Sequence, residues 1–207
     1  VARGSADEVE EALIQLGDTR GIVLDLRGNP GGYLDESLKI GDLFLQRGKR
    51  LASAESRAPG SSGRNVDESW NARGPDVIPE KPVVVLVDRF SASASEIIAG
   101  ALQDHDRAVI IGERTFGKGV FQNVFRLSED RHLRLTTGEW FTPLGRSLHR
   151  PRNVQGRTLP ENPDTFPIVT TPGGRELNAG GGVFPDLEIP NDTLTSTERN
   201  LLSQMAQ

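Results

Sequence analysis

The stretch VVVLVDRFSASASEIIAGALQDHDRAVII, residues 83–111, decides the fold of this chain. Its first five residues, Val83–Val87, form a continuous apolar run typical of a buried strand, and a second short apolar run, Ala108–Ile111, ends it. Between the two runs lie a serine-rich turn and an apolar segment, from about Ala94 to Gln103, that has the length of a helix. A strand, a turn, a helix and a strand in this order predict an α/β fold.

The same order occurs earlier in the chain. Residues Gly21–Leu26 have the pattern of a buried strand, the glycine-rich turn Gly28–Gly32 follows, and apolar residues at helical spacing continue from Leu34 to Leu45. Upstream, Ser5–Glu8 has the spacing of a capping box and predicts the start of a first helix, which Gly17 ends. The chain therefore begins with a helix and continues with repeated strand, turn and helix units.

The remaining segments indicate β structure, surface loop and a terminal helix. Residues 57–79 are polar and rich in Gly, Ser, Arg and Pro, which predicts a long surface excursion with little regular structure. Apolar residues alternate through Val120–Leu127 and again through Leu133–Thr137, which predicts a β-hairpin. A short strand is expected at Phe166–Thr170, and Thr195–Glu198 has the capping-box spacing of a last helix.

Length and composition limit the classes of protein that fit. A chain of 207 residues suits one large domain, or one domain with a small appendage, and we assign residues 1–190 to a core and 191–207 to a C-terminal helical tail. The net charge of −5 makes nucleic acid an unexpected partner, and the apolar runs are far shorter than the ~20 residues of a membrane span. The absence of cysteine removes disulfides, cysteine-based zinc sites and thiol nucleophiles. The chain starts with Val1, as a piece of a longer protein would.

Two familiar kinds of site find little support. Gly112–Lys118 satisfies the G-x-x-x-x-G-K part of a phosphate-binding loop, but Gly119 replaces the Ser or Thr that holds magnesium, and an alternating segment replaces the helix that should follow. A Ser-His-Asp triad would need His105, His132 or His149, and no G-x-S-x-G elbow is present. The triad stays open, because geometry and not sequence order defines one.

A lysine is the alternative base. Lys118 lies between two glycines with Phe116 and Phe121 close by, so its ammonium could be buried against apolar side chains, which lowers a lysine pKa. A neutral lysine can take the proton of a serine hydroxyl. Gln122 would share the face of Lys118 in an extended chain and could orient the amine without adding negative charge. The plainer interpretation is a solvated loop lysine and an ordinary polar strand residue.

The nucleophile would be Ser91, Ser93 or Ser95. Ser93 and Glu96 have capping-box spacing, so Ser93 is expected at the N-terminus of the following helix whether it is only a cap or also a nucleophile. At that position the helix dipole and the backbone N–H of Ala94 could stabilise an oxyanion.

A second oxyanion donor could come from the glycine-rich turn that follows the strand Gly21–Leu26. The backbone N–H of Gly31 or Gly32 is available there, because glycine lets the backbone approach a substrate closely. A plain tight turn is the other interpretation.

These motifs together resemble a known family. Asp25-Leu-Arg-Gly-Asn-Pro-Gly-Gly32, Ser91-Ala-Ser-Ala-Ser-Glu96 and Thr115-Phe-Gly-Lys-Gly119 with Gln122 are similar to segments of the carboxyl-terminal processing peptidases, also called tail-specific proteases. Gly180-Gly-Gly-Val-Phe-Pro-Asp186 looks like a further family segment, and the 25 positions between Ser93 and Lys118 match the family's serine-to-lysine spacing.

The resemblance implies a serine endopeptidase that cleaves proteins near their C-terminus. Ser93 would be the nucleophile, Lys118 the general base and Gln122 the residue that holds the lysine. The oxyanion hole would be formed by backbone N–H groups of Gly31 or Gly32 and of Ala94, with no metal or organic cofactor. A non-catalytic binding module on the same core is the alternative.

The family's architecture and partners are implied in the same way. The fold would be a Clp protease/crotonase-like α/β spiral of strand-turn-helix units with additional β-hairpin elements. Asp104 matches an acidic family position, but it lies roughly 16 Å along the helix from Ser93, so a structural role and a pairing with Arg107 are expected. A PDZ domain would precede the core and bind substrates with exposed, apolar C-termini. The location would be extracytoplasmic: periplasm, cell envelope or chloroplast lumen.

Overall fold

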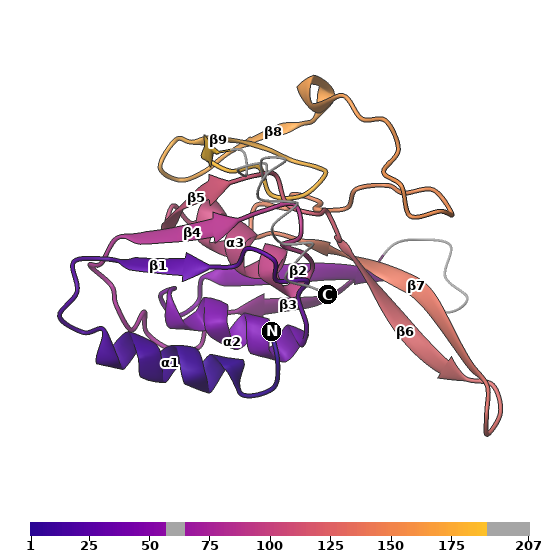
Figure 1. Ribbon diagram of the computed structural model, residues 1–207, viewed down its shortest axis with the longest axis horizontal. Helices are drawn as coiled ribbons and strands as arrows, with labels where there is room; N and C mark the ends of the chain where they lie inside the picture. Colours follow the sequence, from indigo (N-terminus) through magenta and orange to yellow (C-terminus); the bar gives the residue numbers. More distant parts are fainter. Residues whose placement is uncertain (57–64, 190–207) are drawn as a thin grey trace, which may run out of the picture.

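The computed structural model describes residues 1–56 and 65–189 and contains a central parallel sheet, as the strand-turn-helix units predict (Figure 1). In spatial order its strands are β1 (Ile22–Asp25), β4 (Val83–Val87), β5 (Ala108–Gly112) and β10 (Leu187–Glu188), all mutually parallel. The carboxyl ends of parallel strands meet at one edge of a sheet, so the loops after β1, β4 and β5 come together there.

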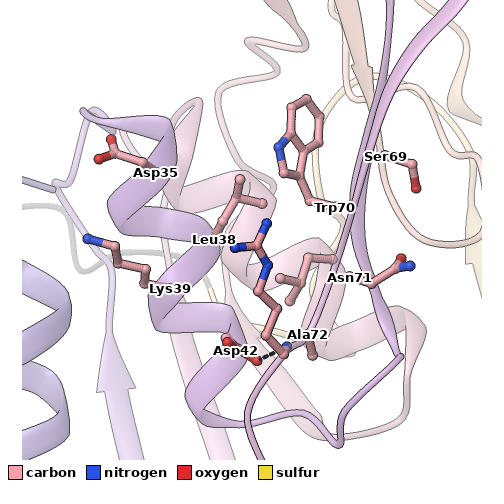
Figure 2. Close-up of a pocket in the computed structure, with 10 residues that line it drawn as sticks. Asp35, Leu38, Lys39, Asp42, Ser69, Trp70, Asn71 and Ala72 are labelled. Carbon is pink, nitrogen blue, oxygen red and sulfur yellow. Dashed lines mark hydrogen bonds between the residues drawn. The ribbon is translucent and has the colours of Figure 1, made fainter.

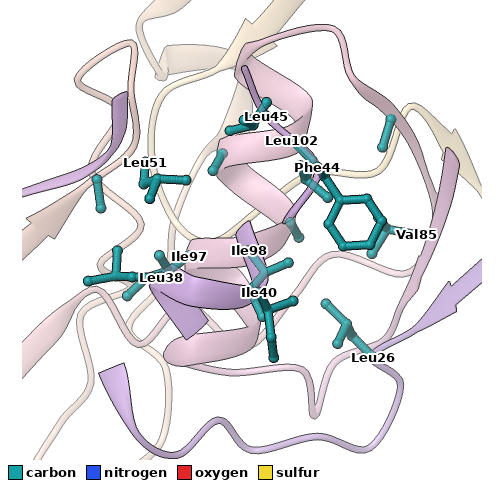
Figure 3. Packing of buried hydrophobic residues seen from close by; sticks show 14 of the residues in the cluster. Leu26, Leu38, Ile40, Phe44, Leu45, Leu51, Val85, Ile97, Ile98 and Leu102 are labelled. Atoms are coloured by element: carbon teal, nitrogen blue, oxygen red, sulfur yellow. The ribbon is translucent and has the colours of Figure 1, made fainter. Parts of the chain in front are cut away.

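Three helices accompany this sheet: α1 (Ser5–Gln15), α2 (Leu34–Leu43) and α3 (Ala94–Asp104). All eleven residues of α3 are buried, so it is an internal helix and not a surface one. Figure 3 shows apolar side chains of α2 and α3 packed near Val85 of β4, Leu26 just after β1 and Phe44 just after α2; the other labelled residues include Leu38, Ile40, Ile97, Ile98 and Leu102. Each fully buried aliphatic side chain of this kind contributes about 1.5–3 kcal/mol.

A second, antiparallel sheet has the order β3-β2-β7-β6. Its strands are β2 (Arg50–Ser56), β3 (Asn65–Asn71), β6 (Val120–Arg126) and β7 (His132–Phe141). The predicted hairpin of β6 and β7 is confirmed, and in Figure 1 it extends away from the rest of the molecule. Trp140 anchors its base, with ring centroids 5.3 Å from Trp70 and 4.9 Å from Phe121.

The C-terminal third is mostly loop. A short 3-10 helix (Pro163–Thr165) precedes the two-stranded pair β8 (Ile168–Thr170) and β9 (Glu176–Asn178), and β8 confirms the strand expected near Phe166–Thr170. The tail expected to form a helix around Thr195–Glu198 lies outside the described residues. The division into 1–190 and 191–207 therefore stays a prediction.

Two expectations were wrong. The expectation of little regular structure in residues 57–79 is wrong for Asn65–Asn71, which form β3 and pair with β2. Neither strand has a continuous apolar run; the backbone ladder with a neighbouring strand stabilises them, and this partner is invisible to a local pattern. The first helix forms as expected, but its N-cap is Gly4 and not Ser5.

Candidate active site

The turn between β4 and α3 separates the three candidate serines. Ser91 is buried and its hydroxyl donates to the carbonyl of Leu26 at 2.8 Å. Ser95 is also buried and donates to the carbonyl of Asn29 at 3.1 Å. Both hydroxyls therefore fasten the turn after β1 to the start of α3. Ser93, which lies between them, is only half-buried and lines a pocket.

The backbone of Ser93 has an unusual conformation. It is the N-cap of α3, with φ 56° and ψ −114°. In the described part of the chain, Ser93 and Asp106 are the only non-glycine residues with a positive φ. Such a conformation costs about 1–3 kcal/mol and persists only when the surroundings hold it. Here the Glu96 carboxylate accepts the Ser93 N–H at 2.8 Å, which is the carboxylate half of the predicted capping box.

Glu96 also holds the loop that carries Lys118. The oxygen that accepts from Ser93 accepts the N–H of Lys118 at 2.8 Å, while the other oxygen accepts from the N–H of Gly117 at 2.7 Å and the hydroxyl of Thr115 at 2.6 Å. Burial raises the pKa of Glu96, and these hydrogen bonds act in the opposite direction. One buried carboxylate thus fixes the backbone of the serine and the lysine relative to each other.

Further contacts immobilise the Lys118 loop. The N–H of Phe116 donates to the carbonyl of Ser91 at 3.0 Å, and the carbonyl of Gly117 accepts from Arg150 at 2.9 Å. Gly119 packs so closely on the backbone of His149 that a Cβ atom would lie 2.3 Å from its nitrogen.

The segment Gly180–Asp186 supports the same loop from the C-terminal side. The carbonyl of Gly181 accepts from the Arg114 side chain, and the Val183 N–H donates to the Thr115 hydroxyl at 2.8 Å. Asp186 binds the N–H of Ile110 in β5 at 2.7 Å. This glycine-rich segment is therefore a brace for the strand and loop that carry Lys118.

Ser93, Lys118 and Gln122 line one pocket of about 610 Å³. Its wall is completed by Gly32, Tyr33, Leu34, Ala94, Ile97, Val120, Phe121, Val124, Arg134 and Trp140. The structure therefore brings together residues from the turn after β1, the start of α3 and β6.

The side chains of the lysine and the glutamine differ from the expectation. Lys118 is exposed and not buried against Phe116 and Phe121. Gln122 is exposed too, and its amide donates to Thr136 at 3.4 Å. Among the described residues, no hydrogen bond joins Lys118 to Ser93 or Gln122. Hydrogen bonds to Glu96 hold the backbone of Ser93 and Lys118, while the exposed lysine borders both this pocket and a hollow next to Phe116.

The candidate oxyanion donors are now distinguishable. The N–H of Gly31 donates to the Asn29 side chain at 3.0 Å, so it is already engaged. Gly32 and Ala94 both line the pocket, and within residues 1–56 and 65–189 neither N–H has a hydrogen-bond acceptor. Gly31 instead allows close packing, because a Cβ atom there would lie 2.8 Å from that of Ser93. The free N–H groups favour Gly32 and Ala94.

Asp104 lies away from this pocket, as expected, but with a different partner. Its carboxylate pairs with Arg146 at 2.6 Å and accepts the N–H of Leu144 at 2.8 Å. Arg107 pairs with Asp76 at 2.8 Å instead. The pairing of Asp104 with Arg107 expected from their closeness in sequence is therefore wrong.

The competing kinds of site are not assembled. None of the three histidines lines the pocket of Ser93, and β6 follows Gly112–Lys118 where nucleotide binding would require a helix. Within the described ranges, no group of three or more His, Asp or Glu side chains is placed to hold a metal ion. The same ranges hold no helix with the length and apolar character needed to cross a membrane.

Two other hollows differ in chemistry from the Ser93 pocket. One, of about 500 Å³, lies between α2 and β3, where Leu38 and Trp70 face each other and Asp42 accepts the N–H of Arg73 (Figure 2). It contains Ser69 and Lys39, but no buried carboxylate links them. The other, of about 510 Å³, borders Lys118 on an apolar side formed with Phe90 and Phe116.

Sequence reasoning missed the central role of Glu96. The residue was noted only as the capping-box partner of Ser93, because a local spacing cannot reveal hydrogen bonds to Thr115, Gly117 and Lys118. A signal was nevertheless present: an acid within an otherwise apolar helical segment must find several donors when it is buried.

Comparisons with known proteins point to one family. Residues 2–155 match the peptidase family S41. A carboxy-terminal-processing protease of Bartonella bacilliformis is 45% identical over 146 residues, covering 69% of this chain and 32% of that protein. A carboxyl-terminal-processing protease of Synechocystis is 35% identical over 174 residues, covering 83% of this chain and 39% of that protein. The chain thus spans about a third of the length of these relatives.

A solved structure extends the likeness to the fold. The photosystem II D1 C-terminal processing protease superposes with a TM-score of 0.68 at 27% identity, covering 94% of this chain and 41% of that one. The parallel sheet, the internal helix α3 and the β6–β7 hairpin form the Clp protease/crotonase-like α/β fold with added β elements that the sequence predicts. With its fold, its motifs and its relatives in agreement, the chain belongs to peptidase family S41.

Proposed function

We propose that this chain is the core of a serine endopeptidase that cleaves proteins near their C-terminus, with Ser93 as nucleophile and Lys118 as general base. The observation that carries the proposal is the single Glu96 oxygen that accepts the N–H groups of both residues at 2.8 Å. The Glu96 carboxylate, which is fully buried, thus holds together two residues that are 25 positions apart in the sequence. The likeness to carboxyl-terminal-processing proteases supports the same assignment.

In the proposed reaction, one part of the pocket supplies the nucleophile and the base, and another part supplies the donors that stabilise the oxyanion. Ser93 Oγ attacks the substrate carbonyl carbon and passes its proton to the neutral amine of Lys118. The carbonyl oxygen becomes an oxyanion, which the N–H groups of Gly32 and Ala94 and the positive end of α3 stabilise. Lys118 then gives the proton to the departing amine, and a water molecule hydrolyses the acyl-enzyme by the same route in reverse.

The lysine side chain completes this arrangement on substrate binding. Catalytic hydrogen bonds are often loose in a free enzyme and tighten when substrate excludes water. The exposed Lys118 has room in the pocket to reach both Ser93 and Gln122, since all three line it. Gln122 then orients the amine as a hydrogen-bond partner that adds no negative charge beside it.

The proposal extends to the longer protein of which such a core is part. Protein chains are the substrates, and those with exposed, apolar C-termini are expected to be preferred. A PDZ domain before the core would capture that C-terminus. An extracytoplasmic location is expected from the family resemblance.

The test is mass spectrometry of an unstructured peptide with an apolar free C-terminus, incubated with the 207-residue chain. Cleavage should fall at least a thousandfold in Ser93→Ala and in Lys118→Ala, since members of such a unit act together. Ser69→Ala and Lys39→Ala, in the hollow between α2 and β3, are matched controls and should cleave normally. Cleavage retained by Ser93→Ala would reject the mechanism, and a folded wild type that binds but never cleaves the peptide would favour a binding module.

A further inference from the structure

The outer edge of β6 has no strand beside it in the described part of the chain. The second sheet has the order β3-β2-β7-β6, so β6 is a terminal strand. Its seven residues, Val120–Arg126, contain no proline or lysine, the residues that commonly protect an exposed edge from pairing. A long unprotected edge favours pairing with another extended chain.

Two hydrogen bonds at opposite ends of the hairpin show which backbone groups face that edge. The Trp140 N–H donates to the carbonyl of Gly119 at 2.7 Å, and the Leu127 N–H donates to the carbonyl of Arg131 at 2.9 Å. In an antiparallel pair, residues alternate between bonding to the partner and pointing their N–H and C=O groups away from it. Gly119 and Leu127, which flank β6, are both odd-numbered, so the odd-numbered residues of β6 bond to β7 and the even-numbered ones, such as Val124, turn their backbone groups outward.

The irregularity in this pair does not disturb β6. Phe121 is paired with Gly138, but Gln122 is paired with Thr136, so the extra residue lies in β7. The outward-facing N–H and C=O groups therefore recur at every second residue from Val120 to Arg126. This is the repeat that an added strand would match.

The same edge passes the candidate nucleophile. Val120, Gln122 and Val124 line the pocket that contains Ser93 and Lys118. A chain paired with the edge would lie against this pocket, and every second side chain would face it. The edge is thus continuous with the reacting groups and not a separate surface.

We propose that the outer edge of β6 binds the substrate polypeptide as an added β-strand, through the backbone groups of Val120, Gln122, Val124 and Arg126. The identity of the bound chain as a substrate rests on the proposed function. Recognition through backbone groups tolerates many side chains, but it requires a segment that is unfolded and free of proline where it pairs. The substrates are therefore proteins with an extended segment at the cleavage site.

The first experiment measures backbone amide hydrogen exchange by NMR in the catalytically inert Ser93→Ala chain, with and without an unstructured peptide. At saturation, exchange of the Gln122, Val124 and Arg126 amides should slow at least fivefold. The amides of Asn123 and Phe125, which already bond to β7, should change less than twofold.

The outcomes separate this proposal from the proposed function, because the inert variant needs no catalysis. Bound peptide without protection of the three even-numbered amides would reject the edge even if the wild type cleaves peptides through Ser93. Protection that appears without peptide and grows with protein concentration would assign the edge to a second copy of the chain instead. Protection by peptide supports the edge whether or not the wild type cleaves.

The second experiment removes single backbone donors. Val124→Pro deletes an outward N–H and no bond to β7, so kcat/KM for peptide cleavage should fall roughly three- to tenfold with an unchanged melting temperature. Val124→Thr, which keeps the N–H but also changes the pocket wall, should lower kcat/KM less than Val124→Pro does. With the wild-type chain, peptides N-methylated at successive positions should lose cleavage with a period of two residues. An equal response to methylation at every position would contradict strand addition.

Discussion

The two ends of α3 each bury an acidic side chain, but the acids have different partners. Asp104, near the C-terminal end, is paired with Arg146, whose side chain is only 1% exposed. Glu96, in the first turn, accepts four hydrogen bonds from backbone N–H groups and a hydroxyl. A buried charge with a counter-ion mainly holds elements together, whereas a carboxylate that gathers backbone donors fixes the positions of those donors. The first kind supports the fold, and the second positions the site.

The largest expected effect comes from leaving Asp104 without its cation. In Arg146→Met the carboxylate stays buried with the Leu144 N–H as its remaining partner, and the free energy of unfolding should fall by about 3–5 kcal/mol. Urea unfolding followed by circular dichroism measures this change. The kcat of the protein that remains folded should stay within about threefold of the wild type, because the pair lies away from the pocket.

A double variant tests the reason for that loss. Asp104→Leu combined with Arg146→Met replaces the ion pair with apolar groups and should recover most of the stability, since no charge is then stranded. A double variant as unstable as the single one would show that the hydrogen bonds of this cluster, and not its charges, matter. A large fall in kcat with unchanged stability would instead place Asp104 among the residues that serve catalysis.

Glu96→Gln should lower the free energy of unfolding less than Arg146→Met does, but it should lower kcat much more. Glutamine keeps one acceptor oxygen, so its NH₂ group must face two donors where the carboxylate accepted both. We expect kcat to fall about ten- to a hundredfold with KM little changed, and the melting temperature to fall less than in Arg146→Met. Peptide cleavage kinetics and thermal unfolding are the two measurements.

If Glu96 positions Ser93, the reactivity of the serine should also depend on Glu96. The rate at which a small fluorophosphonate labels Ser93 should fall with kcat in Glu96→Gln, because the serine backbone is no longer held. Glu96→Asp, which keeps both acceptor oxygens on a shorter side chain, should recover part of both rates. Normal labelling combined with lost stability would reduce Glu96 to a structural helix cap.

Local patterns predicted the parts of this fold that local interactions stabilise. Val83–Val87 forms β4 with the predicted bounds, since a five-residue apolar run rich in valine is typical of a buried strand and is too short for a helix. Residues 65–71, which form β3, were not predicted as a strand. Their sequence has no continuous apolar run, and the backbone hydrogen bonds with β2 stabilise the strand instead.

The candidate site divides in the same way. Ser93 was identified through its helix N-terminus and the family-like motif, both of which are local in sequence. The contacts of Glu96 with Thr115, Gly117 and Lys118 and the pairing of Asp104 with Arg146 join segments about 20 to 40 residues apart, which the spacing rules for helices and strands do not cover.

The smallest expected effect is a pH dependence of stability that arises at the Glu96 end of α3. Burial raises the pKa of Glu96 above the value of 4.5 that applies without it, so between those two values the folded chain binds more protons than the unfolded one. Stability due to this group is therefore full below pH 4.5 and falls as pH rises through the raised pKa, by at most about 1.4 kcal/mol per pH unit.

Subtracting Glu96→Gln from the wild type isolates this dependence, because glutamine does not titrate. Groups with the opposite sign cancel: the Arg27 guanidinium lowers the pKa of Asp25, whose contribution is present above pH 3.8 and disappears as pH falls through its lowered pKa. The difference in unfolding free energy between the two proteins should therefore favour the wild type most at low pH and shrink as pH rises. If urea titrations from pH 4 to 8 show a constant difference in unfolding free energy between the two proteins, the hydrogen bonds from the four donors fully offset the burial of Glu96. Holding Ser93 and Lys118 together would then carry no electrostatic cost to stability.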